Sequence, residues 1–193
     1  MSPAPGNTPL SKDELAQLIP SLATQAELNE FERLNILEGA KWAFSNRVLA
    51  NTDPLTEPYI RELHRRMFDN TWQWAGIYRN TEKNIGVLVH EIRNRIPALL
   101  ADARYWVEKD AYSVDEIAMR VHHGMTVIHP FSNGNGRHAR LLADVIAVKL
   151  GGPEFTWGTK DMVSSGPARE AYIKSLRKAD GGDLRELLAF SRS

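Results

Sequence analysis

The chain has 193 residues, of which 42% are hydrophobic, so it is long enough for one compact domain with a substantial core. Lysine plus arginine equals aspartate plus glutamate at 24 each, so no net charge attracts nucleic acid or an anionic membrane, and zero cysteines exclude disulfides and thiolate metal sites. No apolar run is long enough to span a bilayer and the start lacks the pattern of a signal peptide, so we expect a cytoplasmic protein with no nucleic-acid and no membrane partner.

The N-terminal part of the chain divides into an arm and two helices. The first ten residues are rich in Pro, Gly, Asn and Thr, which predicts a flexible arm. Two capping boxes follow, and they predict a short helix from Ser11 and a longer helix from Thr24 that runs to about residue 49. The expected division is a flexible N-terminal arm at 1–10, an N-terminal helical extension at 11–54 and a main domain at 55–193.

Residues 71–90 form the one stretch without a helical pattern. An extended run passes through Gly76 and reaches Arg79, a polar turn follows at residues 80–84, and a second apolar run covers residues 85–89. This order predicts a small β-hairpin. Because an isolated two-stranded hairpin is only marginally stable, we expect it to pack against the domain or to pair with a strand of a partner.

Two helical patterns dominate the second half of the chain. The first covers residues 113–128, where Ser113 begins a capping box and apolar residues repeat at helical spacing, and Pro130 ends it. The second is marked by apolar residues from Leu141 and stops at Gly151. Further helices are predicted to begin near Thr56, Ile96, Pro167 and Asp183. The sequence therefore predicts an all-α fold apart from the hairpin.

The twelve residues between these two helices, 129–140, read His-Pro-Phe-Ser-Asn-Gly-Asn-Gly-Arg-His-Ala-Arg. Gly134 and Gly136 lack a Cβ atom, so the backbone can approach an anion closely and offer it free N–H groups at the positive end of a helix dipole. Arg137 and Arg140 are three positions apart and share a helix face, which gives two guanidinium groups that match phosphate geometry. This combination predicts phosphate chemistry.

Two other side chains of this stretch have a predicted chemical role. His129 closes the first helix with an imidazole whose ordinary pKa lies near neutrality, so we predict it as the general base that takes a proton from an incoming hydroxyl. Asn135, between the glycines, can donate to a phosphate or ligate a metal through its carbonyl oxygen. Phe131 is predicted to anchor the loop in the core.

The stretch resembles the motif of the Fic family, in which His-Pro-Phe precedes two variable positions, Gly-Asn-Gly-Arg and, three residues on, a second Arg. Eight positions match in order between two predicted helices. The resemblance implies an all-helical Fic fold that transfers a nucleoside monophosphate, usually AMP from ATP, to a Ser, Thr or Tyr hydroxyl of a target protein. It also implies His129 as the base and a nucleotide-binding set made of Ser132, Asn133, Gly134, Asn135, Gly136, Arg137 and Arg140.

The resemblance extends to the predicted hairpin, which in similar proteins is a flap that pairs with the extended target and presents its hydroxyl to the His. The flap residues implied here are Tyr78, Arg79, Ile85, Gly86 and Val87. Two further segments, the Trp-Ala-Gly-x-Tyr-Arg run at 74–79 and the Ala-Asp-x-Gly-Asp run at 179–183, are similar to the branch called mobile mystery protein B.

Position 133 departs from the family pattern. Similar proteins of known activity usually carry Asp or Glu there, whose carboxylate holds the magnesium that bridges the phosphates, and this chain has Asn133. An amide oxygen can ligate a hard cation without adding negative charge, so we expect Mg²⁺ to be weakly held and the activity to be lower. Two alternatives stay open: a Fic-fold nucleotide-responsive binding protein with little catalysis, and transfer of another nucleotide or phosphate-containing group.

Many similar proteins carry an inhibitory helix in which Ser or Thr, three residues, Glu and a small residue follow one another, and the Glu pairs with the second Arg of the motif. The nearest match here is residues 34–39, with Leu34 in place of the hydroxyl and Glu38 as the acid. An ordinary solvated glutamate is the preferred interpretation of Glu38. A carboxylate on a mostly apolar helix also attracts a cation, so Glu38 is an inhibitory candidate with Arg140 as its candidate partner.

The other histidines and the tryptophans have simpler interpretations. Three histidines form no usual zinc set with the candidate base, which predicts helix-surface or core positions for His122, His123 and His138. Packing is also the preferred interpretation, with an adenine platform as the alternative, for Trp72, Trp74 and Trp106. The sequence leaves the target protein, the donor base and the oligomeric state open.

Overall fold

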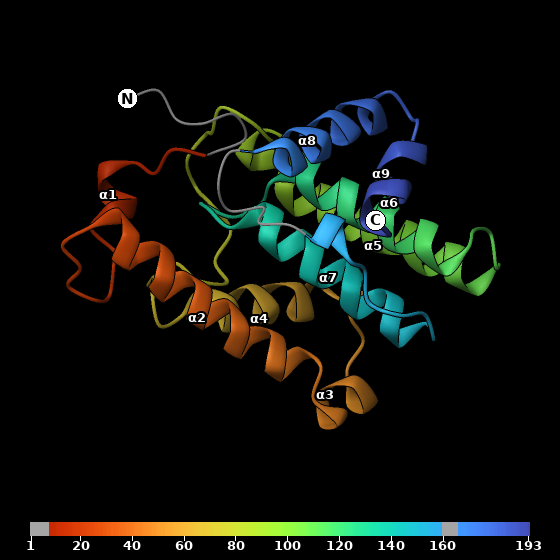
Figure 1. Cartoon of the computed structure of the whole chain (residues 1–193), viewed down its shortest axis with the longest axis horizontal. Coiled ribbons are helices and arrows are strands. Elements are labelled where there is room, and N and C mark those ends of the chain that lie inside the picture. The colour runs from red at the N-terminus through yellow and green to blue at the C-terminus, as the bar shows by residue number, and fades with distance from the viewer. Residues whose placement is uncertain (1–7, 160–165) are drawn as a thin grey trace.

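The computed structural model of the chain describes residues 8–159 and 166–193 and confirms the predicted all-α fold (Figure 1). In chain order the elements are α1 (Lys12–Leu15), α2 (Gln25–Ala43), α3 (Asn46–Asn51), α4 (Glu57–Phe68), α5 (Val89–Glu108), α6 (Val114–Ile128), α7 (Asn135–Lys149), the 3-10 helix η1 (Trp157–Thr159), α8 (Pro167–Asp180) and α9 (Arg185–Ser191). In the part of the chain that the structure describes, no helix is both long and apolar enough to cross a membrane.

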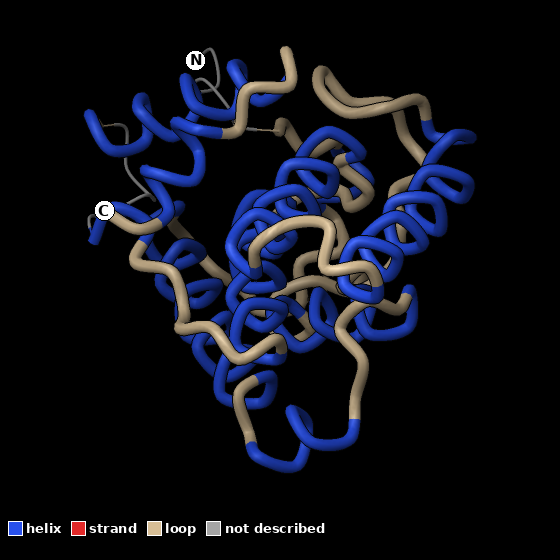
Figure 2. Tube along the Cα trace, turned by 90° about the vertical axis from the view of Figure 1, so that its right-hand side faces the viewer, coloured by secondary structure: helices blue, strands red, loops and turns tan. Residues whose placement is uncertain are grey.

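The helices α6 and α7 pack against each other at the centre of the molecule (Figure 1). Helices α5 and α9 contact α6, α4 contacts α7, and α2 lies along α4 as the next layer. Figure 2 shows the loops that join these helices from the side. Fully buried apolar side chains fill the space between the helices, among them Phe68, Met119, Met125, Phe131, Leu142 and Ile146. The α6–α7 turn is therefore placed on a rigid support.

Two residues set the shape of the turn between α6 and α7. His129 ends α6 in the left-handed conformation, at φ 52° and ψ 59°, and Pro130 prevents the helix from continuing. Gly134 is the N-cap of α7 at φ 77°, and a Cβ atom there would lie 2.5 Å from the ring of Phe68. Both the backbone conformation and the lack of space require glycine at this position.

Two helix boundaries differ from the prediction. The helix expected to run to about residue 49 is broken after α2, because the Ser45 hydroxyl accepts from a backbone N–H and caps a new helix, α3. The helix expected from Ile96 begins earlier, at Val89, and contains Pro97. Local capping thus shortens one predicted helix and lengthens another.

The predicted β-hairpin flap is wrong. The segment it would occupy holds no strand, and an isolated antiparallel bridge joins Tyr78 to Phe131 instead. The Arg79 side chain takes the place of cross-strand pairing, because its guanidinium donates to the backbone carbonyl oxygens of Val87 and His129. With those carbonyls already satisfied, the segment folds as a loop around one buried side chain.

The first seven residues of the predicted flexible arm lie outside the described residues. Thr8, which follows them, is only 9% exposed, and Leu10 packs against the core. The last part of the predicted arm therefore lies against the body of the protein.

Candidate active site

His129 lies at the C-terminal end of α6 with its side chain buried. Burial lowers the pKa of His129 to about 4, and Arg79 and Lys83 act in the same direction, against a hydrogen bond to the Thr126 backbone. The ring is therefore neutral at physiological pH and can accept a proton. Its position and charge state suit the predicted general base.

The ring of His129 faces a residue that the sequence did not mark. Thr8 Oγ1 lies 2.8 Å from Nε2 of His129. The backbone carbonyl oxygen of Thr8 accepts a hydrogen bond from Nδ2 of Asn133 at 3.2 Å. Thr8 therefore contacts two predicted site residues at once. Its place in a Pro- and Gly-rich arm gave no sign of this contact.

Residues 8–14, which we call the N-terminal strap, are held by polar contacts to the loop after Arg79. Nζ of Lys83 lies 2.5 Å from Oε2 of Glu14, and the Thr81 hydroxyl donates to Oε1 of Glu14 at 3.1 Å. Burial alone would raise the pKa of Glu14, but hydrogen bonds from Lys83, a strap backbone N–H and the Ser132 side chain lower it to about 2. The strap is thus anchored by a carboxylate that stays ionised.

Tyr78 and Arg79, two of the predicted flap residues, hold the loop that follows the base. Nε of Arg79 donates to the carbonyl oxygen of His129 at 2.8 Å, and its backbone N–H donates to the carbonyl oxygen of Pro130 at 2.9 Å. The ring of Tyr78 packs on that of Phe131 with centroids 5.4 Å apart. These contacts fix the backbone on which the imidazole is mounted.

The other three predicted flap residues border the base. A Cβ atom on Gly86 would lie 2.6 Å from Cβ of His129, so only glycine allows this approach. The N–H of Val87 donates to the carbonyl oxygen of Ile128 at 3.4 Å. Ile85 carries an exposed apolar side chain.

The glycine turn at the start of α7 already holds an internal acceptor. Oδ1 of Asn133 accepts from the N–H of Gly134 at 2.6 Å and from Nη2 of Arg137 at 3.2 Å. This amide oxygen takes the position at a helix N-terminus that suits an anion. Gly136 is more open, since a Cβ atom there would meet nothing closer than Nη1 of Arg140 at 3.9 Å.

Asn135 supports the turn from inside. Its Oδ1 accepts from the N–H of Phe131 at 2.9 Å and its Nδ2 donates to the carbonyl oxygen of Phe131 at 2.8 Å. The side chain is buried, and both of its polar atoms are used within the loop. In this conformation Asn135 positions the turn, which differs from its predicted contact to a phosphate or a metal.

Arg137 is paired with an acid that the sequence analysis did not single out. Oε2 of Glu32 lies 2.7 Å from Nη1 of Arg137, and Oε1 of Glu32 accepts from Nε1 of Trp72 at 2.7 Å. The side chain of Glu32 is only 10% exposed. The face of α2 that points inward carries the buried residues Glu32, Asn35, Gly39 and Ala43. These four positions recur at helical spacing, so this pattern is the sequence signal that could have identified Glu32 as the inward-facing acid.

Glu38 is a solvated helix residue, as the preferred interpretation has it, and the candidate pairing with Arg140 is wrong. The side chain of Glu38 is 63% exposed, and it pairs with Lys41 at 2.6 Å. The physical reason is helix geometry: residue 38 precedes the buried position 39, and each step along a helix turns the side chain by about 100°. Helix α2 therefore directs Glu32, and not Glu38, toward the motif.

Arg140 lies against Tyr172 of α8. Its guanidinium carbon is 5.3 Å from the centroid of the Tyr172 ring. One turn further along α7, burial raises the pKa of Asp144 to about 7, while this carboxyl accepts from the N–H of Phe155 and from Nε1 of Trp157, both at 3.0 Å. Asp144 therefore attaches the loop after α7 to the helix that carries both arginines.

His64 is a third residue, after Thr8 and Glu32, that the sequence did not mark. Its Nδ1 accepts from the N–H of Gly76 at 2.9 Å, and its Nε2 lies 3.1 Å from the carbonyl oxygen of Asn133. Burial lowers the pKa of His64 well below its ordinary value, so the neutral ring carries its proton on Nε2 and donates to Asn133. The ring also stacks on Phe131 with centroids 3.7 Å apart. A single histidine within a helical pattern gave no signal of this role.

The residues at the turn do not fit a dedicated magnesium site. Across residues 8–159 and 166–193, no group of three or more His, Cys, Asp or Glu side chains could hold a metal ion. Asn133, the predicted weak ligand, uses its Oδ1 to accept from the N–H of Gly134 and from the guanidinium of Arg137.

The remaining aromatic residues pack as predicted. His122 and His138 are fully buried, and His123 pairs with an aspartate at 2.8 Å, which confirms core and surface positions for them. Trp72 and Trp74 are buried with ring centroids 5.0 Å apart, which confirms their packing role.

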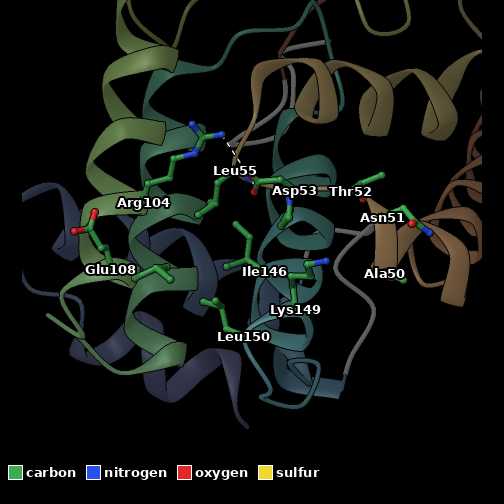
Figure 3. A pocket seen from close by; sticks show the side chains of 12 residues that line it. Ala50, Asn51, Thr52, Asp53, Leu55, Arg104, Glu108, Ile146, Lys149 and Leu150 are labelled. Atoms are coloured by element: carbon green, nitrogen blue, oxygen red, sulfur yellow. Dashed lines mark hydrogen bonds and ion pairs between the residues drawn. The ribbon is translucent and has the colours of Figure 1, made fainter.

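A cavity of about 690 Å³ lies away from the motif, at the C-terminal ends of α5 and α7. Figure 3 shows Leu55, Ile146 and Leu150 lining it, with Arg104 joined to Asp53 at 2.9 Å. None of the predicted site residues lines this cavity. The candidate site is therefore the α6–α7 turn with its covering segments.

Residues 54–147 match the model of the Fic/DOC family. Protein adenylyltransferase fic-1 of Caenorhabditis briggsae is 31% identical over 135 residues, which are 68% of this chain and 25% of that protein. Protein adenylyltransferase Fic of Nematostella vectensis is 29% identical over 167 residues, which are 84% of this chain and 37% of that protein. The chain thus spans well under half the length of these curated relatives.

The fold agrees with these matches. The solved structure of Fic-1 from Caenorhabditis elegans superposes with a TM-score of 0.63 at 25% identity, and the match covers 93% of this chain and 51% of that one. The motif turn, its family match and this superposition lead to one conclusion: the chain belongs to the Fic/DOC family.

Proposed function

We propose that the chain transfers a nucleoside monophosphate, AMP from ATP, to a hydroxyl side chain of a target protein. One observation carries the proposal: Nε2 of a neutral, buried His129 faces a hydroxyl at 2.8 Å beside a helix N-terminus that bears Arg137. The name protein adenylyltransferase, which both curated relatives carry, points in the same direction. Target and donor are proposals for this chain, because it spans only part of those relatives.

The proposed reaction uses the two sides of the turn. On the base side, His129 takes the proton of a Ser, Thr or Tyr hydroxyl while the oxygen attacks the α-phosphorus of the nucleotide. On the anion side, Arg137 and the N–H groups of the turn from Gly134 to Gly136 face the charge on the phosphate oxygens. Arg140 supports them from the same helix, and pyrophosphate leaves.

The proposal includes the assignments made from the sequence that no comparison tests. The nucleotide-binding set is Ser132, Asn133, Gly134, Gly136, Arg137 and Arg140, with Asn135 as its internal support. The segment from Tyr78 to Val87 positions the target as a loop. The division into an N-terminal extension at 11–54 and a Fic domain at 55–193 is part of the same proposal.

A second candidate is a nucleotide-responsive binding protein with little catalysis. Two observations favour it: Glu32 already neutralises Arg137, and Asn133 supplies no carboxylate for a metal. Phosphate binding then requires Arg137 to exchange Glu32 for the ligand. This candidate predicts nucleotide binding without label transfer.

The test is incubation of the purified chain with each of the four labelled nucleoside triphosphates, Mg²⁺ and a cell lysate. We expect a labelled protein band with ATP that is lost in His129→Ala. His90→Ala is the matched control, because His90 is exposed on the first turn of α5. Label with none of the nucleotides would contradict the transferase, and binding without label would leave the second candidate.

A further inference from the structure

The hydroxyl that faces His129 belongs to the chain itself. Thr8 Oγ1 and His129 Nε2 are 2.8 Å apart, which is within the distance at which a general base can remove a proton. In the described part of the chain, no other hydroxyl is hydrogen-bonded to a ring nitrogen of His129. Thr8 therefore occupies the place of an acceptor.

The direction of this hydrogen bond follows from the state of the ring. Burial keeps His129 neutral, and the Thr126 backbone accepts a hydrogen bond from the imidazole. Because a neutral imidazole carries one proton, Nε2 is left as an acceptor, and the Thr8 hydroxyl donates to it. This is the arrangement from which a base takes the proton of an attacking hydroxyl.

Several contacts besides this hydrogen bond hold Thr8 in place. Its carbonyl oxygen accepts from Nδ2 of Asn133 at 3.2 Å, and the carbonyl oxygen of Pro9 accepts from Nζ of Lys83 at 3.2 Å. Lys83 in turn pairs with Glu14 at the end of the strap. These contacts hold the strap on both sides of the Thr8 hydroxyl, whose Oγ1 lies 2.8 Å from Nε2 of His129.

We propose that Thr8 is an intramolecular acceptor, so that the chain modifies its own strap with a nucleoside monophosphate. This inference rests on the proposed transferase function. Thr8 Oγ1 attacks the α-phosphorus of a nucleoside triphosphate, the bond from that phosphorus to the β-bridging oxygen breaks, and pyrophosphate leaves. The hydroxyl proton passes to Nε2 of His129. The products are a phosphodiester on Thr8 and free pyrophosphate.

The modification changes the strap. A modified Thr8 has no hydroxyl proton to donate to Nε2, and it carries an anionic group that a buried position disfavours. The strap then loses its contact with the base, and the base becomes open to the hydroxyl of another protein. Self-modification and target modification therefore compete for one position.

The experiment incubates the purified chain with ATP and Mg²⁺ and maps the product by intact mass and peptide mass spectrometry. We expect one AMP per chain, located at Thr8, with a rate constant independent of protein concentration. Thr8→Val should reduce the label at least about tenfold, because the acceptor oxygen is gone, while Thr8→Ser should keep label at position 8. Ser21→Ala is the matched control, because Ser21 is an exposed hydroxyl of the same N-terminal region.

Three results would overturn the proposal while the proposed function stands. The first is a labelled lysate protein with no label at Thr8. The second is an equal label in Thr8→Val and wild type, or a label mapped elsewhere. The third is a rate constant that rises in proportion to protein concentration. If neither the chain nor the lysate is labelled, both the proposed function and the self-modification are overturned. The peptide map of the wild type decides the question without any variant.

Discussion

The two sides of the α6–α7 turn are covered by different groups from the N-terminal part of the chain. On the base side, His129 holds the neutral hydroxyl of Thr8. On the anion side, Arg137 holds the carboxylate of Glu32. Each side is therefore filled by a group of the same chemical kind as the ligand proposed for it: a hydroxyl for the acceptor and an anion for the phosphate.

The difference between the two sides indicates how a ligand displaces the group that covers each one. A hydrogen bond between a hydroxyl and a neutral ring is worth about 1 kcal/mol, so the base side is easily exchanged. A charge-assisted pair with a largely buried carboxylate is stronger and is lost only to another anion. The base side thus governs the reaction step, and the anion side governs nucleotide affinity.

The largest expected effect is on the base side. We expect His129→Ala to reduce transfer by a factor of about 10² to 10⁴, because the base acts on the attacking hydroxyl in the transition state. The dissociation constant of ATP, measured by calorimetry, should change by less than about twofold, because the phosphates are held by the other side. A loss of ATP binding that matches the loss of rate would show that the two sides are not separate.

The charge state of the base gives a pH dependence. The folded pKa is about 4 for His129 and for His138 and about 3 for His122, each lowered by burial from 6.5. Below about pH 6.5 the unfolded chain binds more protons than the folded one, so each histidine lowers the unfolding free energy by up to about 1.4 kcal/mol per pH unit as pH falls toward 4. Asp144, with its pKa raised to about 7 by burial, opposes this trend.

Urea unfolding between about pH 4 and about pH 6.5 checks this sign. We expect the unfolding free energy to rise with pH across this window, because these three histidines and His64, whose pKa burial also lowers, outweigh one aspartate. Asp144→Asn should make the rise steeper, and His90→Ala should leave it unchanged. A flat or falling curve would mean that the histidines are not held neutral.

The anion side gives the next effect. Glu32→Gln keeps an acceptor for Nε1 of Trp72 but removes the charge that holds Arg137, so ATP affinity should rise about tenfold, or about 1.4 kcal/mol. Glu30→Gln is the matched control, because Glu30 is exposed on the same helix and pairs with Arg33. Equal ATP affinity in Glu32→Gln and wild type would show that the pair does not restrain binding.

The smallest effect concerns Asn133. Asn133→Asp adds a charge that a hard cation prefers, so the Mg²⁺ concentration for half-maximal transfer should fall by a few-fold. The new carboxylate also faces Arg137 and Gly134, which limits the gain. Asn84→Asp, at an exposed position, is the control. An unchanged or weaker Mg²⁺ dependence would mean that position 133 does not face the metal.

The features that could be predicted from the sequence are those that depend on residues close together along the chain. The capping boxes at Ser11 and Thr24 and the turn glycine at 134 are local features, and the structure contains them. The contacts that close the site are not local: Thr8 and His129 are 121 positions apart, and Glu32 and Arg137 are 105 positions apart. Helical periodicity gives the faces of a helix but not which face meets which, so the sequence offers Glu38 as the inhibitory candidate whereas Glu32 contacts the motif.

The prediction of a hairpin was wrong for a related reason. Two apolar runs around a polar turn form paired strands only when their backbone groups have no other hydrogen-bond partner. Arg79 supplies that partner, because its buried guanidinium donates to carbonyl oxygens on both sides of the loop. A single arginine inside an extended run does not reveal whether its side chain points outward or folds back.

The most direct measurement compares ATP labelled at the α-phosphate with ATP labelled at the γ-phosphate in the same transfer reaction. If the hydroxyl at His129 attacks the α-phosphorus and pyrophosphate leaves, the α-label enters protein in wild type and in His90→Ala, and not in His129→Ala. The γ-label should enter none of them. Incorporation of the γ-label, or of the α-label in His129→Ala, would contradict nucleotidyl transfer by this site.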